Sequence, residues 1–223
     1  MQPSRIYVYF CQNKQMVKTS SLTYSYGDEQ EMVFPDIDLP RGDHLLIIGP
    51  SGIGKTTLLY LMAGLLPPVH GNVAVDGTEL NSLSRKEMDS FRGKEIGLIF
   101  QQYHFIKSLN VEDNLVLRQS VLKDSVDKER RHQLAERLGL SGHLNKKVTE
   151  LSQGQQQRLS IALGLIHRPK VILADEPTSN LDDMNCVKVI NLLKEEAEIC
   201  KSSLVIITHD LRVMSHFKNQ VEL

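Results

Sequence analysis

The sequence predicts an α/β fold: a mainly parallel core sheet, an antiparallel β subdomain and an inserted helical subdomain. Three observations predict it. Short apolar runs, such as residues 44–48 and 204–207, lack the polar alternation of half-exposed strands, so they indicate strands buried on both faces. Helical patterns separate these runs, as parallel strands require. A long helical stretch, which we assign to about residues 102–168, interrupts the alternation.

The elements follow from apolar runs and from the residues that end them. A first strand is predicted at residues 17–24, and the run at 44–48 ends at Gly49. A helix then covers residues 55–63 and stops at Gly64, before two prolines. The remaining strands are predicted at residues 72–75, 96–100, 171–174 and 204–207. The remaining helical patterns cover residues 111–140, 155–167 and 184–199.

Length and composition exclude several classes of protein. The 223 residues, 41% hydrophobic and 24% charged, fit one globular domain, assigned to residues 17–223. Residues 1–16 fit it poorly, so Met1 and Met16 both remain candidate starts. A net charge of −1 and 5% aromatic residues argue against a nucleic-acid partner. No apolar run approaches the ~18 residues of a membrane span, so work at a membrane needs a separate partner.

One glycine-rich segment carries the strongest chemical signal. Residues 49–56 fit the pattern G-x-x-x-x-G-K-[ST] between a predicted strand and a predicted helix. Glycines let backbone N–H groups turn toward phosphate oxygens, and the helix N-terminus adds its dipole. Lys55 is expected to reach the β- and γ-phosphates, and the Thr56 hydroxyl to bind Mg²⁺. The expected ATP-binding residues here are Gly49, Pro50, Ser51, Gly52, Ile53, Gly54, Lys55, Thr56 and Thr57.

Two carboxylates follow the apolar run at 171–174. Asp175 and Glu176 emerge at the carboxyl edge of the predicted sheet, where parallel sheets bind their ligands. Asp175 is expected to hold Mg²⁺, directly or through water, and Glu176 to accept a proton from an attacking water. The alternative is an acidic turn that serves only solubility, and the phosphate loop argues against it.

A second motif narrows the class of nucleotide-binding protein. Residues 151–158 read LSQGQQQR, which resembles LSGGQ, the signature sequence of the ABC ATPases. In that family this segment binds the γ-phosphate held by a second subunit, which implies a role in trans for Leu151, Ser152, Gln153, Gly154 and Gln155. Gln153 departs from the usual glycine. The alternative reading of Ser152 is an ordinary helix cap.

The resemblance implies roles for further residues. His209 resembles the switch histidine that contacts the γ-phosphate and orients the attacking water. Gln101 resembles the glutamine that senses Mg²⁺, so the implied metal set is Thr56, Gln101 and Asp175. Tyr26 resembles the aromatic that stacks on adenine, with Tyr24 as the rival. The implied loop that crosses to a second subunit is Ser179, Asn180, Leu181 and Asp182.

Residues 84–101 are similar to the branch of ABC ATPases that serves lipoprotein release, macrolide efflux and cell division. The resemblance implies a P-loop NTPase of ABC type that hydrolyses ATP with Mg²⁺. It would act as a homodimer, or pair with a second ABC ATPase, and drive a separate membrane permease from the inner face of the cell membrane. Residues 103–109 resemble the region that receives the permease, or else belong to the subdomain core. The alternative function is a mechanical or regulatory ATPase of the cell-division type. One departure is Leu163, where many relatives carry arginine.

Overall fold

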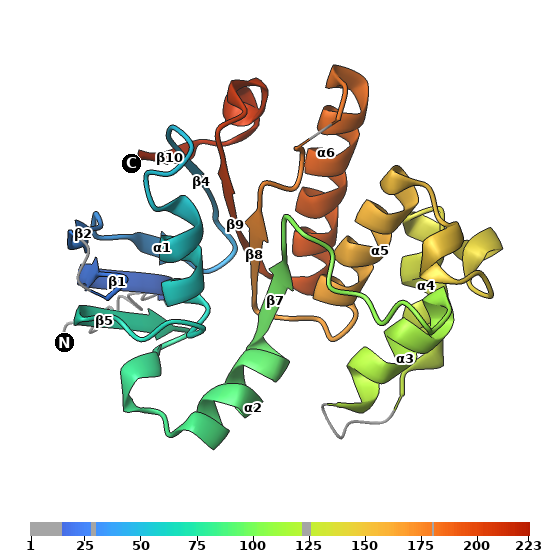
Figure 1. The fold of residues 1–223 in the computed structure, drawn as a ribbon, viewed down its shortest axis with the longest axis horizontal. Helices are drawn as coiled ribbons and strands as arrows, with labels where there is room; N and C mark the ends of the chain where they lie inside the picture. The colour runs from blue at the N-terminus through green and yellow to red at the C-terminus, as the bar shows by residue number, and fades with distance from the viewer. Residues whose placement is uncertain (1–14, 28–29, 122–125, 180) are drawn as a thin grey trace, which may run out of the picture.

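The computed structural model describes residues 15–27, 30–121, 126–179 and 181–223 (Figure 1). The first strand begins at Gln15, two residues before the predicted position, and the side chain of Met16 within it is buried. The rest of the extension that we expected at residues 1–16 lies outside the described residues. No helix in these ranges is long and apolar enough to cross a bilayer.

A five-stranded sheet forms the centre, and every neighbouring pair of its strands is parallel. This confirms the predicted mainly parallel core. In spatial order the strands are β10 (Asn219–Glu222), β4 (His44–Ile48), β9 (Ser203–Thr208), β8 (Val171–Asp175) and β7 (Ile96–Ile99).

A second sheet lies beside the first and pairs antiparallel throughout, as predicted for the β subdomain. Its long strand β1 pairs with three others. Its strands are β1 (Gln15–Tyr24), β2 (Met32–Val33), β3 (Asp38–Pro40), β5 (His70–Val75) and β6 (Thr78–Glu79).

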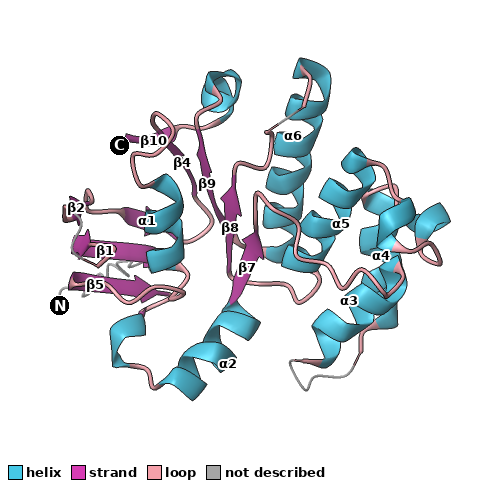
Figure 2. Cartoon of the chain, viewed as in Figure 1, coloured by secondary structure: helices cyan, strands magenta, loops and turns pink. Residues whose placement is uncertain are grey.

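Helices cover both faces of the parallel sheet (Figure 2). Helix α1 packs between the two sheets, α5 and α6 cover the opposite face, and α3 and α4 lie outside α5 (Figure 1). Their bounds are α1 (Lys55–Met62), α2 (Arg85–Glu95), α3 (Val111–Ser120), α4 (Lys128–Arg137), α5 (Gln153–Leu165) and α6 (Asp183–Cys200). The stretch at residues 111–140, predicted as one helical pattern, contains two helices, and Asp127 caps the second one.

Strand alternation divides the hydrophobic core between the two faces. Along β4, Leu45 and Ile47 join the cluster around α1, whereas Leu46 and Ile48 join the cluster under α5 and α6. Strands β8 and β9 alternate in the same way. Because both faces of β4, β8 and β9 are buried, the polar side chains of the predicted site lie where these strands end.

A buried ion pair ties helix α4 to helix α6. Arg130 on α4 donates to Glu196 on α6 at 3.1 Å, and their side chains are 3% and 0% exposed. Arg137 also donates to Glu196 and, at 3.2 Å, to the exposed Glu195. Two guanidinium groups thus share one buried carboxylate, and its loss would leave buried positive charge uncompensated.

We predict that Glu196→Gln lowers the free energy of unfolding by about 3–5 kcal/mol, because the amide keeps the shape but removes the charge. Glu195→Gln is the control: it alters the same arginine's second partner, whose side chain is 62% exposed, and should cost less than about 1 kcal/mol. Urea unfolding of both variants measures the difference. If both variants lose the same free energy of unfolding, the buried ion pair is not the main link between α4 and α6.

Candidate active site

The predicted phosphate loop joins β4 to α1 and leaves an open helix N-terminus. Gly52 and Gly54 have φ angles of 84° and 108°, a region that disfavours other residues. No side chain caps α1, and its first turn contains no acidic residue. The N–H groups at the start of α1 therefore remain available to an anion.

Lys55, the first residue of α1, folds back over this loop. Its Nζ donates to the carbonyl oxygens of Gly49 and Pro50 at 2.8 and 2.9 Å. The side chain is buried, and carbonyl oxygens are its hydrogen-bond acceptors. Lys55 therefore holds a positive charge beside the open helix N-terminus.

Asp175 and Glu176 leave the end of β8 in different directions. Asp175 is buried and accepts a hydrogen bond from the Thr56 hydroxyl at 3.4 Å. Burial raises the pKa of Asp175, and the negative charge of Glu176 adds to this, while the Thr56 hydrogen bond and the Lys55 charge oppose it. Burial therefore makes the ionised carboxylate of Asp175 unfavourable by itself, and a cation bound beside it would stabilise the ionised form.

The backbone of Glu176 is in the left-handed region, with φ at 48°. This conformation is unfavourable for a residue with a side chain, and strong local contacts hold it. Its N–H donates to Ile207 at 2.9 Å. Its carboxylate accepts from the Thr208 hydroxyl at 2.8 Å and from the His209 N–H at 3.1 Å, with His209 Nδ1 at 2.8 Å. Glu176 is thus fixed by the end of β9.

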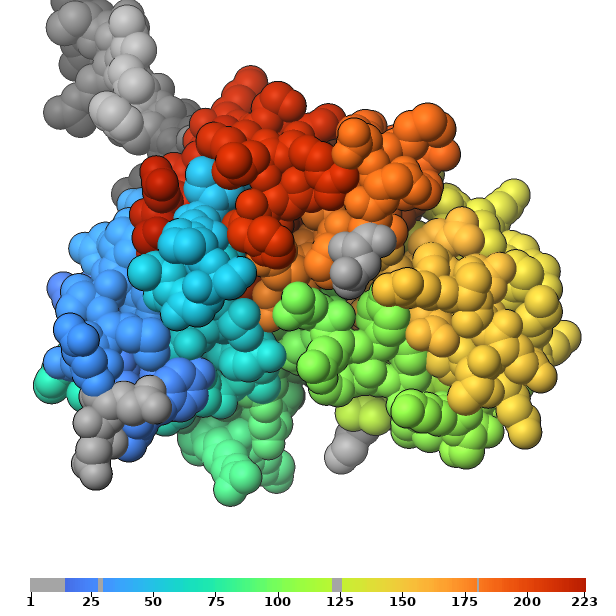
Figure 3. Space-filling view, turned by 45° about the horizontal axis from the view of Figure 1, so that its top comes forward, coloured from blue at the N-terminus to red at the C-terminus, as the bar shows by residue number. Residues whose placement is uncertain are grey.

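One cavity of about 380 Å³ is lined by most of the residues that were predicted to bind ATP and by the two predicted catalytic residues. It opens at the carboxyl edge of the parallel sheet. Figure 3 shows the segments near residue 50 (cyan), near residue 100 (green) and beyond residue 200 (red) meeting on this face. The lining residues are Tyr26, Met32, Ser51, Gly52, Gly54, Lys55, Thr56, Thr57, Gln101, Glu176 and His209.

Of the two tyrosines that were candidates for stacking on adenine, only Tyr26 lines the cavity. Tyr26 lines it, is 46% exposed and shares a hydrogen bond of 3.1 Å with the Thr57 hydroxyl. Tyr24 packs against the core between the sheets and meets the Tyr26 ring edge-on at 4.8 Å. An aromatic face for a ligand ring is therefore offered by Tyr26.

Some predicted ATP-binding residues do not line the cavity. Gly49 and Pro50 contribute carbonyl oxygens to Lys55, and Ile53 is exposed on the loop. Asp175 lies behind Thr56. These residues shape the loop or support those that face the cavity.

The signature segment lies outside this cavity: Leu151 is buried in the core, whereas Ser152, Gln153 and Gly154 are exposed on the surface. Ser152 caps α5: its hydroxyl accepts from the Gln155 N–H at 3.3 Å, and its own N–H donates to the Gln155 side chain at 2.9 Å. Ser152 therefore does cap the helix, as the alternative interpretation proposed. Gln153 and Gly154 are exposed at the N-terminus of this 13-residue helix.

The predicted subunit-crossing loop connects the end of β8 to α6. Ser179 donates through its N–H to Glu176 at 3.1 Å, and Leu181 packs against the core. Asp182 caps α6 through the Asn185 N–H at 2.9 Å. Asn180 lies outside the described residues.

Two contacts near Glu176 were not predicted from the sequence. Thr208 holds Glu176, and its place directly before His209 was the available signal. Gln157 on α5 donates to the carbonyl oxygen of Pro177, so the signature helix touches the turn after Glu176. Only the fold brings these two segments together.

Comparisons with known proteins agree with this geometry. Residues 35–179 match the family model described as ABC transporter. The lipoprotein-releasing system ATP-binding protein LolD of Buchnera aphidicola subsp. Schizaphis graminum is 34% identical over 206 residues, covering 90% of each chain. The macrolide export ATP-binding/permease protein MacB of Escherichia coli is 39% identical over 93% of this chain and 32% of its own.

A solved structure provides a further match. The dimeric, post-hydrolysis structure of the ATP-binding cassette MJ0796 with ADP and Pi superposes with a TM-score of 0.81 and 33% identity. The match covers 93% of this chain and 94% of that one.

Two aspartates, Asp175 in the site and Asp210 next to His209, predict opposite effects on stability. Because the pKa of Asp175 is raised, its ionised form is disfavoured in the folded chain, and stability falls as pH rises through that pKa. Arg212 lowers the pKa of Asp210 to about 2, so stability falls as pH drops from about 4 to 2.

Asp175→Asn should therefore raise the melting temperature at pH 7 without nucleotide, and Asp210→Asn should lower it. The Asp175 difference should shrink as the pH falls below the raised pKa of that group, and the Asp210 difference as the pH falls from about 4 to 2. Thermal unfolding from pH 2 to 8 in a chelator measures this. A lower melting temperature for Asp175→Asn at pH 7 would show that the Asp175 charge is compensated.

Proposed function

The chain belongs to the ABC transporter family of ATP-binding proteins, and on this premise we propose that it is the ATP-hydrolysing subunit that drives a separate membrane permease. Residues 17–223 would form the ABC ATPase domain and residues 102–168 its helical subdomain. The observation that carries the proposal is the single cavity that unites Lys55, Thr56, Gln101, Glu176 and His209.

ATP would bind with its phosphates on the loop at residues 49–56. The uncapped N–H groups of α1 donate to phosphate oxygens, and Lys55 turns from Gly49 and Pro50 to the β- and γ-phosphates. Tyr26 offers its exposed ring to the adenine. Binding thus exchanges the carbonyl partners of Lys55 for charged ones, which form stronger hydrogen bonds.

The residues around Thr56 fit Mg²⁺. The Thr56 hydroxyl and the Asp175 carboxylate are neighbours, Gln101 lines the same cavity, and oxygen ligands are those that Mg²⁺ prefers. Thr56 and Gln101 would hold the ion, with Asp175 acting from behind Thr56 through water. The ion would neutralise phosphate charge, and its charge would relieve the burial cost of ionised Asp175.

Hydrolysis needs a base and an oriented water, and Glu176 and His209 supply them. Glu176 accepts the proton of the water as oxygen attacks the γ-phosphorus and ADP leaves. In this structure the His209 ring contacts one carboxylate oxygen of Glu176. We infer a resting arrangement, from which His209 turns to the γ-phosphate and releases that oxygen for water.

The cavity holds one half of a composite site. The exposed N-terminus of α5, with Ser152 and Gly154, offers N–H groups and a hydroxyl to the γ-phosphate of a second subunit. Residues 179–182 would cross to that subunit. Two chains, or this chain and another ABC ATPase, would then close head to tail on two ATP molecules.

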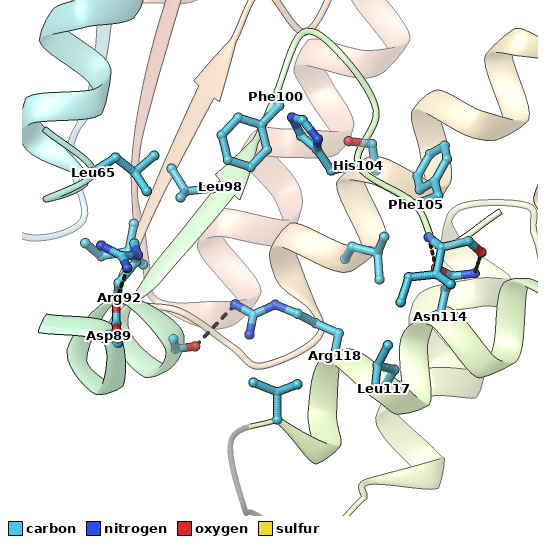
Figure 4. Close-up of a pocket in the computed structure, with 16 residues that line it drawn as sticks. Leu65, Asp89, Arg92, Leu98, Phe100, His104, Phe105, Asn114, Leu117 and Arg118 are labelled. Atoms are coloured by element: carbon cyan, nitrogen blue, oxygen red, sulfur yellow. Dashed lines mark hydrogen bonds and ion pairs between the residues drawn. The ribbon is translucent and has the colours of Figure 1, made fainter. Parts of the chain in front are cut away.

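The permease would hold the chain on the inner face of the cell membrane. Residues 103–109 begin two residues after Gln101, and Phe105 packs on the core and also lines a surface groove (Figure 4). The exposed part of this segment supports the proposal that it receives the permease. Relatives named for lipoprotein release and macrolide export favour transport over the cell-division alternative.

Glu176→Gln should reduce ATP turnover roughly 10²–10⁴-fold, because the amide keeps the shape and removes the base. ATP binding should persist, so Mg²⁺-ATP should trap a dimer on size-exclusion chromatography. Turnover of the purified variant within a few-fold of wild type would exclude Glu176 as the base.

Mixing two inactive variants tests the composite site. Lys55→Ala loses the phosphate loop and Ser152→Arg loses the signature, so each homodimer has two defective sites. A mixed dimer can place both lesions in one site and assemble the other from intact halves. Steady-state ATPase assays across mixing ratios should show recovered activity.

ATP-dependent formation of mixed dimers is scored alongside, with two tags for sequential purification. Wild-type chains provide the control for dimerisation. If wild type dimerises while the variants yield neither mixed dimers nor activity, the head-to-tail arrangement is wrong for this protein.

A further inference from the structure

Hydrogen bonds fix how the side chain of Gln155 lies in the signature segment. Its Oε1 accepts the Ser152 N–H at 2.9 Å, so the other end of the amide, the Nε2 group, points away from that N–H. This Nε2 group lies 2.9 Å from Nε2 of His143. An amide nitrogen can only donate, so Nε2 of the His143 ring is the acceptor and carries no proton.

His143 belongs to another segment, the short helix η2 (Ser141–His143), which follows α4. Its N–H donates to the Leu140 carbonyl oxygen at 2.8 Å, and its carbonyl oxygen accepts from the Lys146 N–H at 3.0 Å. Leu140 lies in the hydrophobic core, and Leu144 packs against it. The backbone of His143 is therefore anchored on both sides, and its ring contacts α5 from a fixed position.

The tautomer of His143 is unfavourable for the fold. Because Nε2 accepts, the proton of the neutral ring lies on Nδ1, which is buried and has no hydrogen-bond partner among the described residues. A buried donor without an acceptor destabilises a folded chain. The other tautomer, or a protonated ring, would direct an N–H at the amide nitrogen of Gln155. That amide could accept it only by turning over, which would break its hydrogen bond with Ser152.

The orientation of the Gln155 amide determines which donors the signature segment offers. Gln155 occupies the Ser152 N–H, and the Ser152 hydroxyl oxygen accepts the Gln155 N–H at 3.3 Å, so the hydroxyl proton is left to donate elsewhere. Gln153 and Gly154 are exposed, and their N–H groups lie in the first helical turn, where the helix has no carbonyl acceptor for them. One hydroxyl and two N–H groups are thus left for an anion.

We propose that His143 is a positioning residue for ATP hydrolysis. Through its unprotonated Nε2 it fixes the Gln155 amide, and so holds the donors of residues 152–154 in the orientation that receives a γ-phosphate. The inference rests on the proposed function, because it needs the composite site. His143 then acts on the ATP molecule that the second subunit binds, and not on the ATP of its own chain. The buried Nδ1–H is accepted in the fold because Nε2 is needed as an acceptor.

Two variants of His143 separate this role from a structural one. His143→Phe keeps a ring but removes the acceptor, so kcat should fall about fivefold, the loss expected for one hydrogen bond. The melting temperature should stay equal or rise, because the unsatisfied Nδ1–H is removed as well. His143→Gln supplies an oxygen that can accept from Gln155, and it should restore most of kcat. His132→Phe, the same change at an exposed histidine on α4, is the control and should alter neither quantity.

Mixed dimers show which ATP molecule is affected. With a large excess of Lys55→Ala, the working site joins the phosphate loop of the His143→Phe chain to an intact signature, so turnover should equal that of wild type in the same excess. With a large excess of Ser152→Arg, the working site uses the signature of the His143→Phe chain. Turnover should then be about fivefold below that of wild type in the same excess.

Each outcome decides a separate point. If Lys55→Ala and Ser152→Arg together recover no activity, the composite site of the proposed function is wrong, whatever His143 does. If they recover activity, four results overturn this inference alone. These are wild-type kcat for His143→Phe, a lower melting temperature with unchanged kcat per folded chain, no rescue by His143→Gln, and an equal loss of turnover in both mixtures.

Discussion

Burial of the parallel sheet on both faces is the constraint on which the rest of the structure depends. The central strands are apolar along most of their length, because alternate residues enter two separate cores, whereas the edge strand β10 is polar and mostly exposed. The polar groups of the central strands therefore gather at the strand ends. Gly49, Gln101, Glu176 and His209 follow four different strands of this sheet, so the burial of the strands also brings the predicted site residues together.

Elements with strong apolar signals were predictable to within a residue or two. Strand β4 occupies its predicted range, β8 extends its range by one residue at the C-terminal end, and β9 extends its range by one residue at each end. Helix α2 was not predicted, because none of its residues is fully buried and only Met88 and Phe91 pack against the core, which gives a weak apolar signal. Its one signal was local: Ser84 and Glu87 form a capping box at its start.

For the site, sequence motifs predicted which residue types gather but not how they pair. The motif at residues 49–56 places Lys55 at the loop, whereas its hold on two carbonyl oxygens follows only from coordinates. The contact between Glu176 and His209 joins two strand ends that are distant in sequence. Gln157 was assigned no role, and its hydrogen bond to the Pro177 carbonyl oxygen follows only from the fold.

The shared carboxylate of Glu196 is one link in a series of side-chain contacts that connects three helices. Arg131 on α4 donates to Glu112 and Gln119 of α3, so α3 and α4 are joined, and Glu196 joins α4 to α6. Helix α6 runs from Asp183 to Cys200, and its capping residue Asp182 lies in the loop that follows Glu176. A displacement of α3 would therefore be passed through these side-chain contacts to the loop next to Glu176.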